Sequence, residues 1–165
     1  MPSTISDDSL RFATLLGRTV AAAGAMAGLL LVLVLFQFRI PYKPGFGVII
    51  LATLIGLAAS VWWVGELVGR AIARQGRAGV AWGPVAGLAC LGLGACSFAL
   101  ASGAMNVERE LSFGLVQAIW DYVGKPFVFI MLAGGIPAAL IGLSGATAIH
   151  LVLAWQKKAH VGGAP

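Results

Sequence analysis

The sequence predicts an all-α integral membrane protein, with four transmembrane helices in an antiparallel bundle and one interfacial amphipathic helix between spans three and four. Two observations lead to this prediction. Of the 165 residues, 59% are hydrophobic and only 10% are charged, which leaves too little polar surface to cover a soluble globule. Apolar runs long enough for a helix to cross a bilayer also recur along the whole chain.

Four runs reach that length, and none has the alternating pattern of a membrane β-strand. They lie at about residues 19–38, 46–68, 80–105 and 127–155. A stretch of about eighteen mostly polar residues precedes the first run, so we expect no cleavable signal peptide. The sequence thus predicts a single membrane domain over residues 1–165.

Lysine and arginine predict which side each loop faces, because cytoplasmic loops carry the excess of basic residues. We therefore expect a multi-pass protein of the cell inner membrane with both termini cytoplasmic. The loop RIPYKPG at residues 39–45 predicts a tight turn between the first two spans. In this orientation the inner basic residues are Arg11, Arg18, Arg70, Arg74, Arg77, Lys157 and Lys158, and the outer ones are Arg39, Lys43, Arg109 and Lys125.

Three arginines follow the second span at intervals of four and three residues. Arg70, Arg74 and Arg77 would share one face if the helix continued into the cytoplasm. A basic face of this kind favours contact with anionic lipid headgroups. We expect these side chains to anchor the inner face of the protein.

The segment at about residues 107–124 has an amphipathic pattern between the last two spans. Asn106 is a credible N-cap for a helix here, and Pro126 is expected to stop it. We expect an interfacial helix on the outer face, either a surface connector anchored by Trp120 and Tyr122 or a docking helix for an external partner. Its apolar side is formed by Leu111, Leu115, Ile119, Tyr122 and Val123.

Small residues recur in the spans at spacings that let helices approach closely. The first two spans contain GAMAG (24–28) and GELVG (65–69). Because lipid tails provide no hydrophobic force between helices, close packing of such residues is the main device that holds a bundle together. The third span carries a helix-packing seam at alternating intervals of four and three residues, formed by Gly83, Gly87, Cys90, Gly94, Ser97 and Ala101.

The fourth run is long and contains a helix breaker. Pro137 follows Gly134 and Gly135, removes one backbone hydrogen bond and crowds the carbonyl of Ala133. We expect a kink at Pro137, which is either structural or part of a gate. The cysteines Cys90 and Cys96 lie on different sides of the third span and predict no disulfide or redox site.

Glu66 is the one carboxylate close to an apolar run in the first half of the chain. An acid within a span is costly and usually functional. Trp62 and Trp63 precede it, and tryptophan favours the membrane interface. We therefore expect Glu66 at headgroup depth, where Arg70 at i+4 can pair with it.

His150 lies five residues before Trp155 on the fourth span. If the second and fourth spans touch, Glu66 and His150 would form a pair that responds to protons or ions. The alternative is that His150 bonds a neighbouring carbonyl or a lipid headgroup.

Motifs for chemistry are missing from the sequence. It contains no hydrolase elbow, phosphate-binding loop or zinc-protease motif. With only two histidines we expect no metal site and no cofactor. The net charge of +5 is spread over short loops, which argues against a nucleic acid partner. An enzyme acting on lipids or quinones would need residues such as Glu108, Arg109, Glu110 or Asp121 to converge.

These features favour a non-enzymatic accessory or scaffold subunit of a bacterial cytoplasmic-membrane complex, of which a transporter is one candidate. The expected partners are the lipid bilayer and either other membrane subunits or further copies of the chain. The length and the four-span plan resemble those of the small membrane subunits of tripartite carboxylate transporters, a likeness of architecture without a shared motif. The alternative is a small ion- or proton-coupled transporter or channel acting as a homo-oligomer, with Pro137 as a gate and a path lined by Ser97, Ser144, Thr147 and His150.

Overall fold

The computed structural model describes residues 7–35, 46–110 and 114–162, which form helices and contain no β-strand. The prediction of an all-α fold is therefore confirmed for this part of the chain. The expected turn at residues 39–45 lies outside it. The long helices are α1 (Asp7–Leu35), α2 (Phe46–Gln75), α3 (Trp82–Glu110) and α5 (Lys125–Gly162); the short elements are the 3₁₀ turn η1 (Gly76–Ala81), α4 (Leu115–Ile119) and the π-helical turn η3 (Trp120–Gly124).

Two helical stretches are long and apolar enough to cross a membrane. The first, Gly47–Asn106, comprises most of α2, η1 and most of α3, and the second, Leu115–Gln156, comprises α4, η3 and most of α5. Large apolar side chains on them point outward, for example Leu132 at 78% exposure and Ile136 at 75%. A soluble protein would bury much of this surface, so the exposed apolar faces fit a lipid environment.

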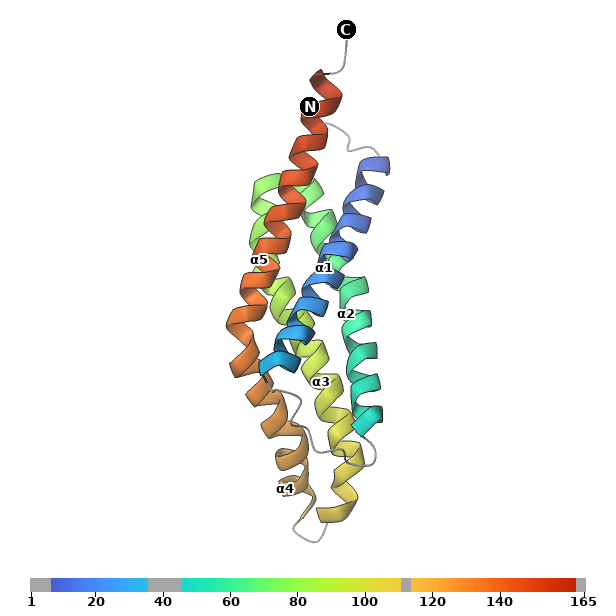
Figure 1. Cartoon of the computed structure of the whole chain (residues 1–165), viewed down its shortest axis with the longest axis vertical. Helices are drawn as coiled ribbons and strands as arrows, with labels where there is room; N and C mark the ends of the chain where they lie inside the picture. The colour runs from blue at the N-terminus through green and yellow to red at the C-terminus, as the bar shows by residue number, and fades with distance from the viewer. Residues whose placement is uncertain (1–6, 36–45, 111–113, 163–165) are drawn as a thin grey trace.

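The four long helices lie side by side, and successive ones run in opposite directions along the long axis (Figure 1). Around the bundle, α1 packs on α2, α2 on α3 and α3 on α5, while α1 and α5 share a smaller contact. α1 begins and α5 ends toward the end where η1 lies, and α4 lies at the opposite end (Figure 1). The start of α1, the end of α5 and the α2–α3 connection are thus at one end of the bundle, which we call the end of the termini.

The helix-packing seam of α3 serves two neighbours. Near its start, a Cβ at Gly83 or Gly87 would collide with the backbone of Gly142 or Ala138 on α5. Farther along, Cys90 lies beside Ser60 of α2. Gly94 contacts the Leu57 side chain and Ser97 lies against Gly56, both on α2, and Ala101 is half-buried. Since α3 lies between α2 and α5, one stripe of small residues lets it approach both helices.

The prediction of a separate interfacial helix at about residues 107–124 is wrong. Residues 107–110 form the last turn of α3, and the chain is helical without a break from Leu115 into α5. Asn106 is not an N-cap, because its side-chain amide lies within α3 and donates to the carbonyl of Ser102 at 2.8 Å. Ala118 is only 1% exposed and α4 contacts α3, so α4 packs on α3 through Ala118 and leaves its larger side chains exposed.

Pro126 does not stop the helix; it lies in the first turn of α5. A proline lacks the N–H that would bond the residue four positions earlier, here Tyr122, and its ring crowds that carbonyl. The ladder widens into a π-helical turn at Trp120–Gly124, which relieves this crowding. α5 also continues through Pro137, and the kink and gate expected there stay predictions.

Candidate functional site

The first candidate site is built on the crossing of α1 and α2. A Cβ at Gly17 would collide with the carbonyl of Gly65, and one at Gly69 would collide with the carbonyl of Ala13. Ala13 is fully buried in this contact. Small residues four apart on both helices therefore let the two backbones touch. This contact fixes the register of α1 against α2.

The register brings together the charged residues that directly follow three of the crossing glycines. Arg18 Nη2 donates to Glu66 Oε2 at 2.5 Å, and Arg70 Nη2 lies 2.6 Å from Glu66 Oε1. The guanidinium carbon of Arg18 lies 3.7 Å from the ring centre of Trp62, a cation–π contact. We call Arg18, Trp62, Glu66 and Arg70 the charge cluster.

The charge cluster is partly buried and carries an excess positive charge. The side chains of Arg18 and Glu66 are each 23% exposed, whereas that of Arg70 is 50% exposed. Both carboxylate oxygens of Glu66 are bound, which offsets the cost of removing it from water. Arg18 Nε is buried and makes no hydrogen bond within the described residues. Two arginines against one carboxylate leave one net positive charge, with Arg70 on the accessible side.

A groove of about 340 Å³ lies beside the charge cluster on α2. Its lining residues are Trp62, Trp63, Glu66, Leu67 and Arg70. Trp63 is 71% exposed and Leu67 is 64% exposed, so the groove opens on the outer surface of the bundle. An aromatic and aliphatic wall thus stands next to a cation. We call this the Trp63 groove.

Arg70, Arg74 and Arg77 were expected to share one continuous helical face, but the helix ends before the third of them. Arg70 and Arg74 are exposed on the last turns of α2, but α2 ends at Gln75. Gly76 then has φ +59, a left-handed conformation that glycine adopts without strain, and Arg77 is exposed on η1 beyond it. The expected face is therefore broken at Gly76, and headgroup contact by the three arginines stays a prediction.

His150 is half-buried on α5. Within the described residues, the carboxylate oxygens of Glu66 are bound by arginines, and no hydrogen bond or ion pair joins Glu66 to His150. The expected pairing of these two residues stays a prediction. The hydroxyls of Ser97, Ser144 and Thr147 each donate to a carbonyl of their own helix, and the latter two residues face outward.

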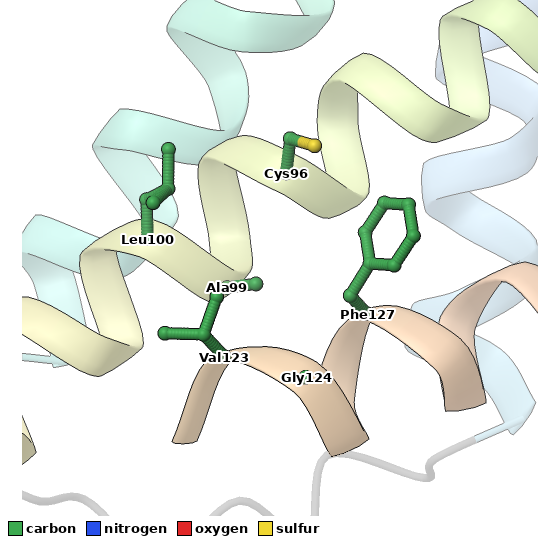
Figure 2. A pocket seen from close by; sticks show the side chains of 6 residues that line it. All are labelled: Cys96, Ala99, Leu100, Val123, Gly124 and Phe127. Carbon is green, nitrogen blue, oxygen red and sulfur yellow. The ribbon is translucent and has the colours of Figure 1, made fainter. Parts of the chain in front are cut away.

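A second groove, of about 200 Å³, lies between α3 and the segment formed by η3 and the start of α5 (Figure 2). Small residues line part of it, namely Cys96, Ala99 and Gly124, together with the larger Leu100, Val123 and Phe127. Cys96 is an exposed free cysteine, whereas Cys90 is half-buried on another side of α3. The lining is apolar apart from the thiol. We call this the Cys96 groove.

Asp121 lies two residues before Val123 of the Cys96 groove in the chain, and its carboxylate contacts two nearby side chains. Lys125 Nζ lies 2.5 Å from its Oδ1, and Gln117 Nε2 donates to Oδ2 at 3.1 Å. The side chains of residues 108–110, with which Asp121 was to converge in an enzyme, lie outside the described ones.

Among the described residues, no group of three His, Cys, Asp or Glu side chains gathers in a way that could hold a metal ion. Comparison with family models, curated proteins and solved structures gives no match to the chain. The functional interpretation therefore depends on sequence and geometry.

Sequence reasoning paired Glu66 with Arg70 but missed Arg18, which lies 48 positions away along the chain. A signal for it does exist. Ala13 and Gly17 have the same four-residue spacing as Gly65 and Gly69, and a charged residue directly follows Gly17, as it does Gly65. Aligning the two small-residue pairs in opposite directions would have brought the opposite charges together.

Proposed function

We propose that α1, α2, α3 and α5 each cross the membrane, with both termini in the cytoplasm. On α2, Glu66 is the first charged residue and comes twenty residues after Phe46, about 30 Å at 1.5 Å per residue, which matches the hydrocarbon thickness. The charge cluster then lies where lipid tails give way to headgroups. The end of the termini also carries Arg74 and Arg77, as the positive-inside rule requires.

Reporter fusions test this topology. A reporter that is active only in the cytoplasm, fused after the last residue, is expected to be active, and one inserted beside Gly114 is expected to be silent. The reverse result at either position would contradict the four-span arrangement.

We further propose that the chain is a non-enzymatic accessory or scaffold subunit of a bacterial cytoplasmic-membrane complex, such as a transporter. The observation that supports this function is the Cys96 groove. The small residues Cys96 and Gly124 line this groove beside larger apolar side chains, of which Leu100 is 63% exposed. In lipid, helices associate where such residues permit close approach. The groove therefore suits one transmembrane helix of a partner subunit.

The face next to this groove supports the same proposal. α4 exposes large apolar side chains, with Val116 at 83%, Leu115 at 56% and Ile119 at 47%. α4 lies directly before η3, which lines the groove, so these side chains and the groove are at the same end of the bundle. The partner expected there is another membrane protein, because the surface offers shape and apolar area but little charge.

The free cysteine in the groove allows a direct test by crosslinking in the native membrane. A Cys90→Ala chain, which keeps only Cys96, is expected to form an adduct with a different membrane protein that mass spectrometry can identify. The matched Cys96→Ala chain keeps only Cys90 and is expected to form none. If neither chain is crosslinked and the protein purifies alone in mild detergent, the scaffold proposal is wrong.

The alternative, a small ion- or proton-coupled transporter or channel acting as a homo-oligomer, stays a prediction. In the crosslinking experiment it would give an adduct between two copies of the chain. Proton or ion flux into vesicles that contain only this protein, abolished by His150→Ala, would favour it over the scaffold function.

A further inference from the structure

The Trp63 groove combines a cation with an apolar wall on one exposed face of α2. Trp63 and Leu67 present apolar surface, while Arg70 lies one turn farther toward the end of the termini. This arrangement has the polarity of an amphiphile, with an anionic group toward Arg70 and an apolar chain along Trp63 and Leu67.

Arg70 is the group in this groove that can receive an anion. A guanidinium has five N–H donors in a planar fork, and the 2.6 Å contact of Arg70 with Glu66 is made through Nη2. Half of the side chain is exposed. Glu66 does not repel an anion strongly, because two arginines neutralise its carboxylate. Arg74, exposed one turn on, adds positive charge on the same side of α2.

Arg18 and Glu66 act as positioning residues for Arg70. Arg18 binds Glu66 from α1 and stacks on Trp62, so the carboxylate is held from the bundle side. Glu66 in turn holds Arg70 through Oε1. The guanidinium of Arg70 is thereby fixed next to the groove, and fixing a long side chain in advance lowers the entropy cost of binding.

We propose that the Trp63 groove binds one anionic phospholipid, whose phosphate contacts Arg70 and whose acyl chain lies along Trp63 and Leu67. Phosphate is the chemistry that a planar, half-exposed guanidinium recognises best. A free phosphate ion would use Arg70 but would leave the apolar wall without a partner. The lipid site is independent of the proposed scaffold function, since it is on α2 and shares no lining residue with the Cys96 groove.

Native mass spectrometry of the full chain, released from nanodiscs, tests the site. The nanodiscs contain equal amounts of phosphatidylglycerol and phosphatidylcholine. Both lipids carry a phosphate, but the choline cation of phosphatidylcholine is repelled by Arg70 and Arg74, so the wild-type chain is expected to retain one phosphatidylglycerol in about tenfold preference. Arg70→Gln is expected to abolish the preference. The matched control Arg77→Gln removes an exposed arginine outside the groove and is expected to keep it.

Two further experiments test the ligand and the apolar wall. The first asks whether a lipid or a free phosphate ion binds, and the second removes the wall without changing any charge. Millimolar inorganic phosphate is expected not to displace the retained lipid; displacement would overturn the choice of a lipid ligand. Trp63→Ala leaves every charge in place and is expected to weaken retention severalfold by removing the apolar wall. Equal retention of both lipids by the wild-type chain, or unchanged preference in Arg70→Gln and Trp63→Ala, would overturn the proposal.

Discussion

The α1–α2 pair and the α3–α5 pair are held by the same backbone device in different surroundings. In each pair, small residues four apart bring two backbones into contact, at Gly17 and Gly65 in the first and at Gly87 and Gly142 in the second. The first crossing is flanked by the charge cluster. The second is surrounded by small and apolar side chains. Comparing the two pairs therefore distinguishes the stability that close packing gives alone from the stability that the charge cluster adds.

The difference shows where each device is useful. Close packing needs no water and works at any depth, because it depends on van der Waals contact between backbones. An ion pair is affordable only where its members are partly solvated or fully bonded, and both conditions hold for Arg18 and Glu66. The charge cluster thus strengthens the crossing that lies at the proposed membrane boundary.

The largest effect is expected where packing acts alone. Gly142→Ala places a methyl group against the backbone of Gly83 and Gly87 and should destabilise the protein by about 2–3 kcal/mol, as overpacking does. Unfolding in mixed micelles measures this loss. Gly92→Ala is the matched control on α3, because its nearest neighbour is the sulfur of Met131 at 3.9 Å. Equal stability of the two variants would refute the α3–α5 crossing.

A smaller loss is expected at the α1–α2 crossing. Gly69→Ala would collide with Ala13, but α1 is confined mainly by α2 and less by α5, so it can shift. We expect a loss of about 1–2 kcal/mol, read from the same unfolding transition. Gly47→Ala, with open space around it, serves as the control on α2. A loss larger than that of Gly142→Ala would reverse the ranking of the two crossings.

Removing the charge of Glu66 tests what the charge cluster adds. Glu66→Gln leaves Arg18 and Arg70 facing each other without their shared carboxylate. We expect a loss of about 1 kcal/mol, discounted for partial exposure, together with a weaker dependence of stability on salt. Asp8→Asn makes the same charge change at an exposed position in the first turn of α1, where it removes only a contact with the helix dipole and should cost clearly less. Matching results for the two variants would mean that the charge cluster contributes nothing.

The smallest effect concerns Asp121, at the end of the bundle where α4 lies. Its carboxylate contacts Lys125 one turn on and accepts a hydrogen bond from Gln117 one turn back, and exposed pairs of this kind contribute little. We expect Asp121→Asn to leave the unfolding transition unchanged and to speed up hydrogen exchange only in α4. An unfolding loss as large as that of Glu66→Gln would contradict this ranking.

The helical class could be predicted from the sequence because long apolar runs allow few alternatives in lipid. The pairing of Glu66 with Arg70 was also predictable, since both are on one helix at i+4. Arg18 was not found, because its contact depends on the register of two helices, which no periodicity within one helix reveals. The small residues that set this register are in the sequence, but their partners across the bundle are known only from the fold.

The segment between α3 and α5 was mispredicted for a different reason. Its period suggested an amphipathic surface helix, and Pro126 suggested an end. The chain instead stays helical through Pro126, because the turn before it widens into a π-helix. The segment also packs on α3 through Ala118. Tertiary packing thus overrode a local breaker signal, and the Cys96 groove beside this turn could not have been foreseen.

In this structure Glu66 joins α2 to α1 through its ion pair with Arg18, at the proposed membrane boundary. A double-mutant cycle tests it most directly, with Arg18→Met, Glu66→Gln and the double variant unfolded in mixed micelles. We predict a coupling energy of about 0.5–1 kcal/mol, because each single change leaves the other residue without its partner. If the losses of unfolding free energy in the two single variants add up to that of the double variant within about 0.3 kcal/mol, Arg18 and Glu66 act independently. That result would contradict a stabilising ion pair between α1 and α2.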